Sequence, residues 1–144
     1  MVIDIETLKK SYQAAVAYHN RAYQFKEEGQ RHSLIFNVGS VALESYLVAL
    51  CELNGDPPAN HDFVMLTKMV ESHMAIPEEL GKAICSLNDI FGICSIKNYH
   101  HGTPEAEDAE FVLKLCDEVS GLFNQEKLKW LFRQERNGPF LTVN

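Results

Sequence analysis

The sequence predicts an all-α protein, an antiparallel bundle of about five helices. Three observations favour this class. Apolar residues recur at helical spacing along most of the 144 residues. Residues 41–51 are apolar on nearly every helical face, so this segment needs other helices around it. Prolines and glycines separate the periodic segments, and no stretch shows the alternation of a convincing strand.

The first two predicted helices are the longest. The first spans about residues 4–28, and Gly29 is a suitable C-terminal cap. The second spans about residues 30–54 and stops at Gly55 and two adjacent prolines. Their similar lengths suit an antiparallel pair. The apolar seam of the first helix consists of Ile5, Leu8, Tyr12, Ala15, His19 and Ala22. A histidine on such a seam is more often a satisfied core residue than a catalyst.

Three shorter helices complete the predicted bundle. Asp62 can cap a helix over residues 63–74. Pro77 suits the first turn of the next helix, and Pro104 suits the start of the last one. Two inward stripes are expected in the last two helices: Leu80, Ile84, Leu87, Phe91 and Cys94, then Ala109, Val112, Cys116, Val119 and Phe123.

Composition indicates a soluble globular domain, with 46% hydrophobic and 23% charged residues. No uninterrupted apolar run reaches the roughly 18 residues of a membrane span. The first residues lack the pattern of a signal peptide. We therefore expect a cytoplasmic protein without a membrane segment. The four cysteines form no CxxC pair and are interpreted as reduced packing residues.

Charge divides the chain into two parts. The net charge of −7 disfavours binding to a nucleic-acid backbone by the molecule as a whole. Residues 125–144, however, hold four basic and two acidic side chains, together with Leu128 and Trp130. We expect residues 1–124 to form the bundle. The basic tail, residues 125–144, could contact RNA, but its apolar residues favour packing on a second subunit.

Glu44 is the single charged residue of the apolar segment 41–51. One interpretation is that its carboxylate reaches a crevice and pairs with a basic group. The other is that it lies in a polar pocket between helices, where burial would raise its pKa. Lys97, His61 and His19 are candidate partners, and the sequence does not choose among them.

Two further groups contain residues capable of chemistry. The doublet His61-Asp62 resembles part of a metal site, but no supporting ligand spacing follows, and we expect no metal. The preferred interpretation has Asp62 cap a helix and His61 bond to a backbone carbonyl.

The second group contains a cation, an amide, a phenol and two imidazoles between the last two predicted helices: Lys97, Asn98, Tyr99, His100 and His101. Such side chains can bind phosphate or exchange protons near neutral pH. We treat them, with Glu44, as the ligand-binding candidates.

The order of these parts resembles a HEPN domain (higher eukaryotes and prokaryotes nucleotide-binding). The resemblance covers about residues 5–124. It depends on the central helix around Glu44, the turn into residues 61–66, and the Lys97-Asn98-Tyr99 turn before residues 105–123. It implies an antiparallel helical bundle, often dimeric, with a polar cleft along the dimer seam. Some members are metal-independent ribonucleases, some are nucleotide-binding partners of nucleotidyltransferases in toxin–antitoxin pairs, and some are inactive scaffolds.

The chain departs from the ribonuclease members of that family. Lys97 stands where they carry an arginine, and His101 follows after three intervening residues instead of four to six. Lysine lacks the planar fork with which arginine grips a phosphate. We therefore expect a non-catalytic nucleotide- or partner-binding homodimer without a cofactor. A nucleotide, RNA or a nucleotidyltransferase protein are the expected partners. The alternative is a divergent metal-independent ribonuclease or toxin–antitoxin component.

Overall fold

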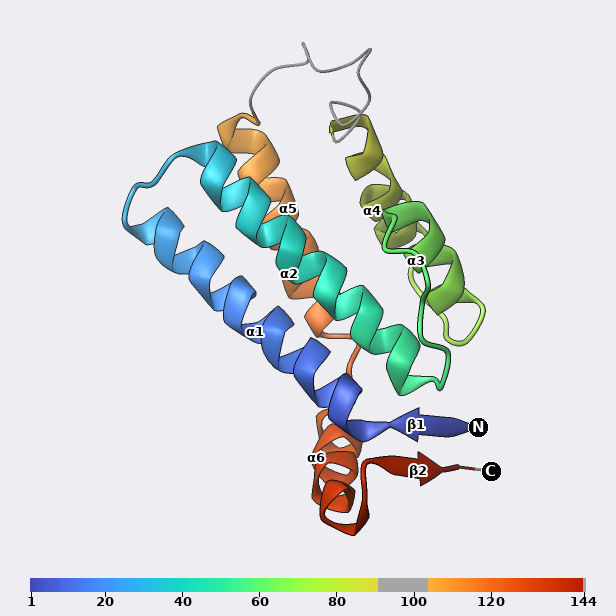
Figure 1. Cartoon of the computed structure of the whole chain (residues 1–144). Helices are drawn as coiled ribbons and strands as arrows, with labels where there is room; N and C mark the ends of the chain where they lie inside the picture. The colour runs from blue at the N-terminus through green and yellow to red at the C-terminus, as the bar shows by residue number, and fades with distance from the viewer. Residues whose placement is uncertain (91–103, 144) are drawn as a thin grey trace.

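The computed structural model describes residues 1–90 and 104–143 (Figure 1). Over these residues the fold is an all-α bundle with one small ribbon of two strands, so the predicted fold class is confirmed. The helices are α1 (Ile5–Glu27), α2 (His32–Leu53), α3 (Phe63–Glu71), α4 (Glu78–Ile90), α5 (Ala106–Ser120) and α6 (Gln125–Gln134), and a 3-10 turn follows at Glu135–Asn137. The strands are β1 (Val2–Asp4) and β2 (Phe140–Thr142).

The second helix, α2, is the central element of the bundle. It packs against α1, α5 and α3, with α1 beside it and α5 behind it in Figure 1. Among the described residues it is the one helix long and apolar enough to cross a membrane, and 67% of that apolar window is buried inside the bundle. The core helix of a soluble protein passes the same test, so this is weak evidence for a membrane span. The prediction of an enclosed apolar helix is confirmed.

The helix ends follow their local sequence. Asp4 caps α1 by accepting a hydrogen bond from the Thr7 amide at 3.0 Å. Gly29 and Gly55 follow α1 and α2 with φ of +70° and +72°, a conformation that favours glycine. At the start of α5, Glu105 and Asp108 form a reciprocal capping box. The boundaries of α1 and α2 therefore lie within two residues of those predicted.

α2 approaches α5 closely at Gly39. A Cβ at this position would lie 2.8 Å from Cγ1 of Val112, which is fully buried. The thiol of Cys116 donates a hydrogen bond to the Gly39 carbonyl oxygen at 3.2 Å. Glycine at position 39, which has no side chain, therefore allows these two helices to pack this closely.

The prediction that the chain lacks strands is wrong at its two ends. β1 and β2 pair antiparallel, with Ile3 opposite Leu141, and the buried side chain of Ile3 joins the core. Each strand has three residues, too few for an alternating pattern to be recognised. The tail also packs on its own chain, because Leu128 and Leu131 of α6 are buried there. Packing of this tail on a second subunit stays a prediction.

Smaller differences concern the shorter helices and the cysteines. α3 ends at Glu71, three residues before the predicted end. The stripe of α4 is buried at Leu80, Ile84 and Leu87, whereas Phe91 and Cys94 lie outside the described residues. Every inward position predicted for α5 is buried. The three described cysteines are free thiols: Cys51, Cys85 and Cys116.

Candidate functional site

Glu44 lies at a surface groove between α1, α2 and the loop that follows α2. Its side chain is 36% exposed, and its Oε1 atom is 3.6 Å from Nδ1 of His61. The groove has a volume of about 270 Å³. Its lining consists of Lys10, Ser11, Ala14, Glu44, Ser45, Val48 and His61. We refer to it as the Glu44 groove.

The Glu44 groove combines hydrogen-bond donors with one anionic acceptor. Ser45 carries a hydroxyl, the Ser11 hydroxyl donates to Glu52, and Lys10 carries an exposed ammonium that also pairs with Glu6 at 3.3 Å. The imidazole of His61 is half exposed, so it can contact a ligand and Glu44 together. A small polar molecule with both donors and acceptors suits such a lining.

The partly exposed side chain of Glu44 agrees with the crevice interpretation, and among the described residues its basic neighbour of the three candidates is His61. His19, the second candidate, makes its contacts elsewhere. Lys97, the third candidate, lies outside the described residues. The same holds for the other ligand-binding candidates of that segment: Asn98, Tyr99, His100 and His101. The sequence analysis missed Lys10, Ser11 and Ser45, because the register of α1 against α2 decides which polar residues share a groove.

The interpretation of Asp62 as a helix cap is confirmed. Its Oδ2 atom accepts hydrogen bonds from the amides of Val64 and Met65, both at 3.1 Å. Nδ1 of His61 faces Glu44, and among the described residues no hydrogen bond joins its ring to a backbone carbonyl, so the carbonyl partner stays a prediction. Within residues 1–90 and 104–143, no group of three or more His, Cys, Asp or Glu side chains is placed to hold a metal.

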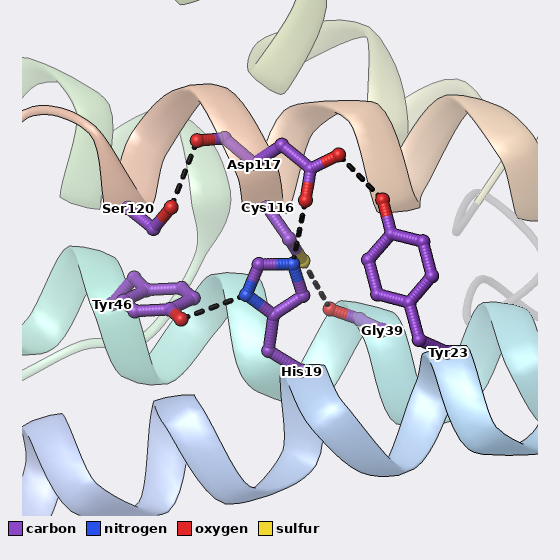
Figure 2. Close-up of polar contacts among 7 residues, drawn as sticks. All are labelled: His19, Tyr23, Gly39, Tyr46, Cys116, Asp117 and Ser120. Atoms are coloured by element: carbon purple, nitrogen blue, oxygen red, sulfur yellow. Dashed lines mark hydrogen bonds and ion pairs between the residues drawn. The ribbon is translucent and has the colours of Figure 1, made fainter.

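A second polar cluster joins α1, α2 and α5 around His19 (Figure 2). Nδ1 of His19 is 2.8 Å from the Tyr46 hydroxyl, and Nε2 is 2.8 Å from Oδ1 of Asp117. The Tyr23 hydroxyl donates to the other carboxylate oxygen of Asp117. The Ser120 hydroxyl donates to the backbone oxygen of Asp117, not to its carboxylate.

The contacts of His19 fix the role of each ring nitrogen. A carboxylate only accepts hydrogen bonds, so Nε2 carries a hydrogen toward Asp117. In the neutral ring Nδ1 then accepts from Tyr46, and in the imidazolium form it donates to the same oxygen. Both nitrogens are engaged in either state, and the side chain is 13% exposed. The prediction that His19 is a satisfied core histidine is confirmed.

The two phenols and the thiol of this cluster hold their protons at neutral pH, and burial raises their pKa values further. Desolvation raises the pKa of Tyr46, and the nearby Cys116 acts in the same direction. Desolvation, followed by the hydrogen bond to Asp117, raises the pKa of Tyr23 to about 12. Burial also raises the pKa of the Cys116 thiol to about 12. None of these groups is activated as a nucleophile, so the cluster is suited to holding helices together.

Comparison with protein-family models, with curated proteins and with solved structures found no match.

Proposed function

We propose that this chain is a non-catalytic, HEPN-like binding module that acts as a homodimer and holds a nucleotide or a partner protein. The observation that carries the proposal is the Glu44 groove. It joins an anionic acceptor, an imidazole, hydroxyls and a nearby ammonium at one surface opening. The carboxylate suits N–H or ribose O–H donors, and the lysine and hydroxyls suit phosphate oxygens.

The neighbouring His19 cluster favours binding over catalysis. Its imidazole has no free nitrogen, and its phenols hold their protons at neutral pH. The alternative function is a divergent metal-independent ribonuclease or toxin–antitoxin component. That function would use Lys97, His100 or His101, with Glu44 as a polarising neighbour. Cleavage of single-stranded RNA in EDTA by the purified protein, abolished by His101→Ala, would establish it.

An exposed apolar pair supports the homodimer. Ala14 and Ser45 line the same groove across the antiparallel α1–α2 pair. One helical turn after Ala14 on α1 is Tyr18, and one turn before Ser45 on α2 is Val41. Because the two helices run antiparallel, we expect Tyr18 and Val41 to lie opposite each other. These side chains are 44% and 41% exposed. A second copy covering them would bring two Glu44 grooves to one seam, as the resemblance implies.

Nucleotide binding is tested directly by calorimetry and thermal shift. A panel of purine and pyrimidine mono-, di- and triphosphates is titrated in EDTA into the native protein. A ligand at a hundredfold excess over its Kd should stabilise the fold by about 2.7 kcal/mol. Glu44→Gln and His61→Ala should abolish the response. His73→Ala is the matched control, because it removes a similar pair, His73 Nε2 with Asp56 Oδ2 at 2.8 Å, outside the groove.

The assembly is tested by light scattering after size-exclusion chromatography. The native chain should elute as a dimer and Val41→Glu as a folded monomer. Met65→Glu is the control, because Met65 is equally exposed but lies on α3. A monomeric native chain that still binds a nucleotide would remove the homodimer and keep the binding module. A monomer that binds no nucleotide, but co-purifies with a nucleotidyltransferase through this face, would assign the partner-protein role.

A further inference from the structure

Glu52, in the last turn of α2, is a buried carboxylate with an unused oxygen. Glu52 is only 7% exposed, and its Oε1 atom has no hydrogen-bond partner among the described residues. Among the described residues, Oε1 of Glu52 is the only buried side-chain oxygen or nitrogen without a hydrogen-bond partner. A buried acceptor without a partner destabilises the fold, so a ligand that donates a hydrogen bond to this oxygen would be stabilising.

Glu52 also lines a second surface pocket, separate from the Glu44 groove. This pocket has a volume of about 270 Å³, and its lining residues come from both strands, the start of α1, the end of α2 and the loop after α2. Its lining consists of Val2, Asp4, Thr7, Glu52, Gly55, Pro57 and Phe140. Most of this lining is apolar, and the ring of Phe140 is 64% exposed at the rim.

The electrostatics of the pocket favour a cation. Burial raises the pKa of Glu52, and the charge of Asp4 raises it further. A hydrogen bond from Ser11 and the charge of His61 act in the opposite direction. Among the described residues, no lysine or arginine forms an ion pair with Glu52 or Asp4. The pocket thus brings together two carboxyl groups without a strong cation.

We propose that this pocket binds a primary alkylammonium group, with the ammonium on Glu52 and its apolar stem against Val2, Pro57 and Phe140. An exposed aromatic ring at the rim also attracts cations. Ser11 engages one carboxylate oxygen, and Oε1 is the unpaired one. Because Oε1 is buried, the Glu52 side chain has to turn to bring this oxygen into the pocket when the ammonium binds. A single free oxygen suits the point charge of an ammonium better than the two-pronged guanidinium, which prefers both oxygens.

The same chemistry can come from a free aliphatic amine or from a lysine side chain of another protein. The inference does not depend on the proposed nucleotide site, because the two pockets have no lining residue in common. Failure of one therefore leaves the other intact.

The test is a calorimetric titration of the native chain with n-butylammonium, n-butylguanidinium and n-butanol, which share one stem. Butylammonium should bind saturably, butylguanidinium about tenfold more weakly, and butanol not at all. Glu52→Gln should abolish binding, and it should fold because it removes a buried charge. Phe140→Ala, at an exposed position, should weaken binding. Glu71→Gln, at the end of α3 and outside both pockets, is the control and should bind as the native chain does.

Two further probes distinguish the sources of the amine. Tighter binding of 1,5-diaminopentane than of Nα-acetyl-lysine-N-methylamide assigns a free amine, and the reverse order assigns a lysine side chain. Absence of saturable butylammonium binding would overturn the proposal. Undiminished binding by Glu52→Gln, or equal binding of butylguanidinium, would overturn it as well.

Discussion

His19 and Asp117 stand 98 positions apart in the sequence, yet Nε2 of the imidazole lies 2.8 Å from Oδ1 of the carboxylate. This contact fastens α1 to α5, and the opposite ring nitrogen fastens α1 to α2 through Tyr46. Three helices therefore meet at one imidazole (Figure 2). The arrangement predicts that His19 matters for stability in a way that depends on Tyr46.

Replacing His19 by alanine should leave the buried Tyr46 hydroxyl without its partner and lower the free energy of unfolding by about 1–3 kcal/mol. Asp117 is half exposed and can regain water. In a Tyr46→Phe background the same replacement should cost less, because no hydroxyl is left unpaired. Urea unfolding of the four chains in this cycle measures the difference. Strictly additive losses would show that the His19–Tyr46 contact contributes nothing.

The raised tyrosine pKa values predict a loss of stability in alkali. In the unfolded chain a tyrosine ionises near its ordinary value of 10.0, whereas the folded chain holds the Tyr23 proton up to about 12. The folded state therefore binds more protons between these values, and the free energy of unfolding falls as the pH rises from about 10 to about 12. Burial shifts the pKa of Tyr46 in the same direction.

Urea midpoints measured across this pH range test the effect. The double variant Tyr23→Phe, Tyr46→Phe should lose less stability per pH unit than the native chain. Tyr18→Phe is the control, because Tyr18 lies exposed on α1 outside the cluster. Equal slopes for the native chain and the double variant would contradict the assignment.

Much of the fold could be predicted because helices are encoded locally. The spacing of Leu8, Ala15 and Ala22 predicts the buried face of α1, and Gly29 marks its end. The apolar character around Leu47 predicts that α2 is enclosed. These features need no knowledge of distant residues.

The candidate sites depend on distant residues and were harder to predict. The spacing around His19 indicates a core position, but no pattern indicates that Asp117, on another helix, would be its partner. Glu52 directly follows the apolar segment and resembles an ordinary end-of-helix carboxylate. β1 packs against α2, and Val2 and Phe140 line one pocket with Glu52, but those strands were not predicted.

Because α2 approaches α5 closely at Gly39, any larger side chain at this position should disturb the packing of the two helices. Gly39→Ala should destabilise the fold by about 1–3 kcal/mol, because the new methyl group meets buried Val112. Adding Val112→Ala should recover part of that loss, although it removes core volume itself. Gly81→Ala in α4 is the control. Its new methyl group makes only ordinary van der Waals contacts, with Thr67 and Glu71 of α3, so this change should be neutral or stabilising. Thermal melts of the native chain and these three variants measure the effect, and an unchanged melting temperature for Gly39→Ala would contradict the close approach.

Glu44 should matter little for stability, because its side chain is 36% exposed and pairs with an imidazole that is 53% exposed. Glu44→Gln and Glu44→Leu should each change the free energy of unfolding by less than about 1 kcal/mol. If the carboxylate were buried and hydrogen-bonded, Glu44→Leu would instead be much less stable than Glu44→Gln. Urea unfolding of both variants distinguishes these cases.

The tail should contribute to the core through one face of α6. Leu131→Ala should destabilise the fold by about 2–5 kcal/mol, because its side chain is fully enclosed. Trp130→Ala, at the neighbouring exposed position, should cost much less despite its larger side chain. A comparable loss for both variants, measured by urea unfolding, would indicate that Trp130 is also covered, as packing on a second subunit would require.

The ribbon imposes an order on how the chain is completed during synthesis. Val2–Asp4 is synthesised long before Phe140–Thr142, the strand with which it pairs. The α1–α2 hairpin can form from neighbouring sequence long before that, whereas Ile3 waits for a strand that does not yet exist. Until then this end of the nascent bundle stays open, and a holding chaperone would find apolar side chains there.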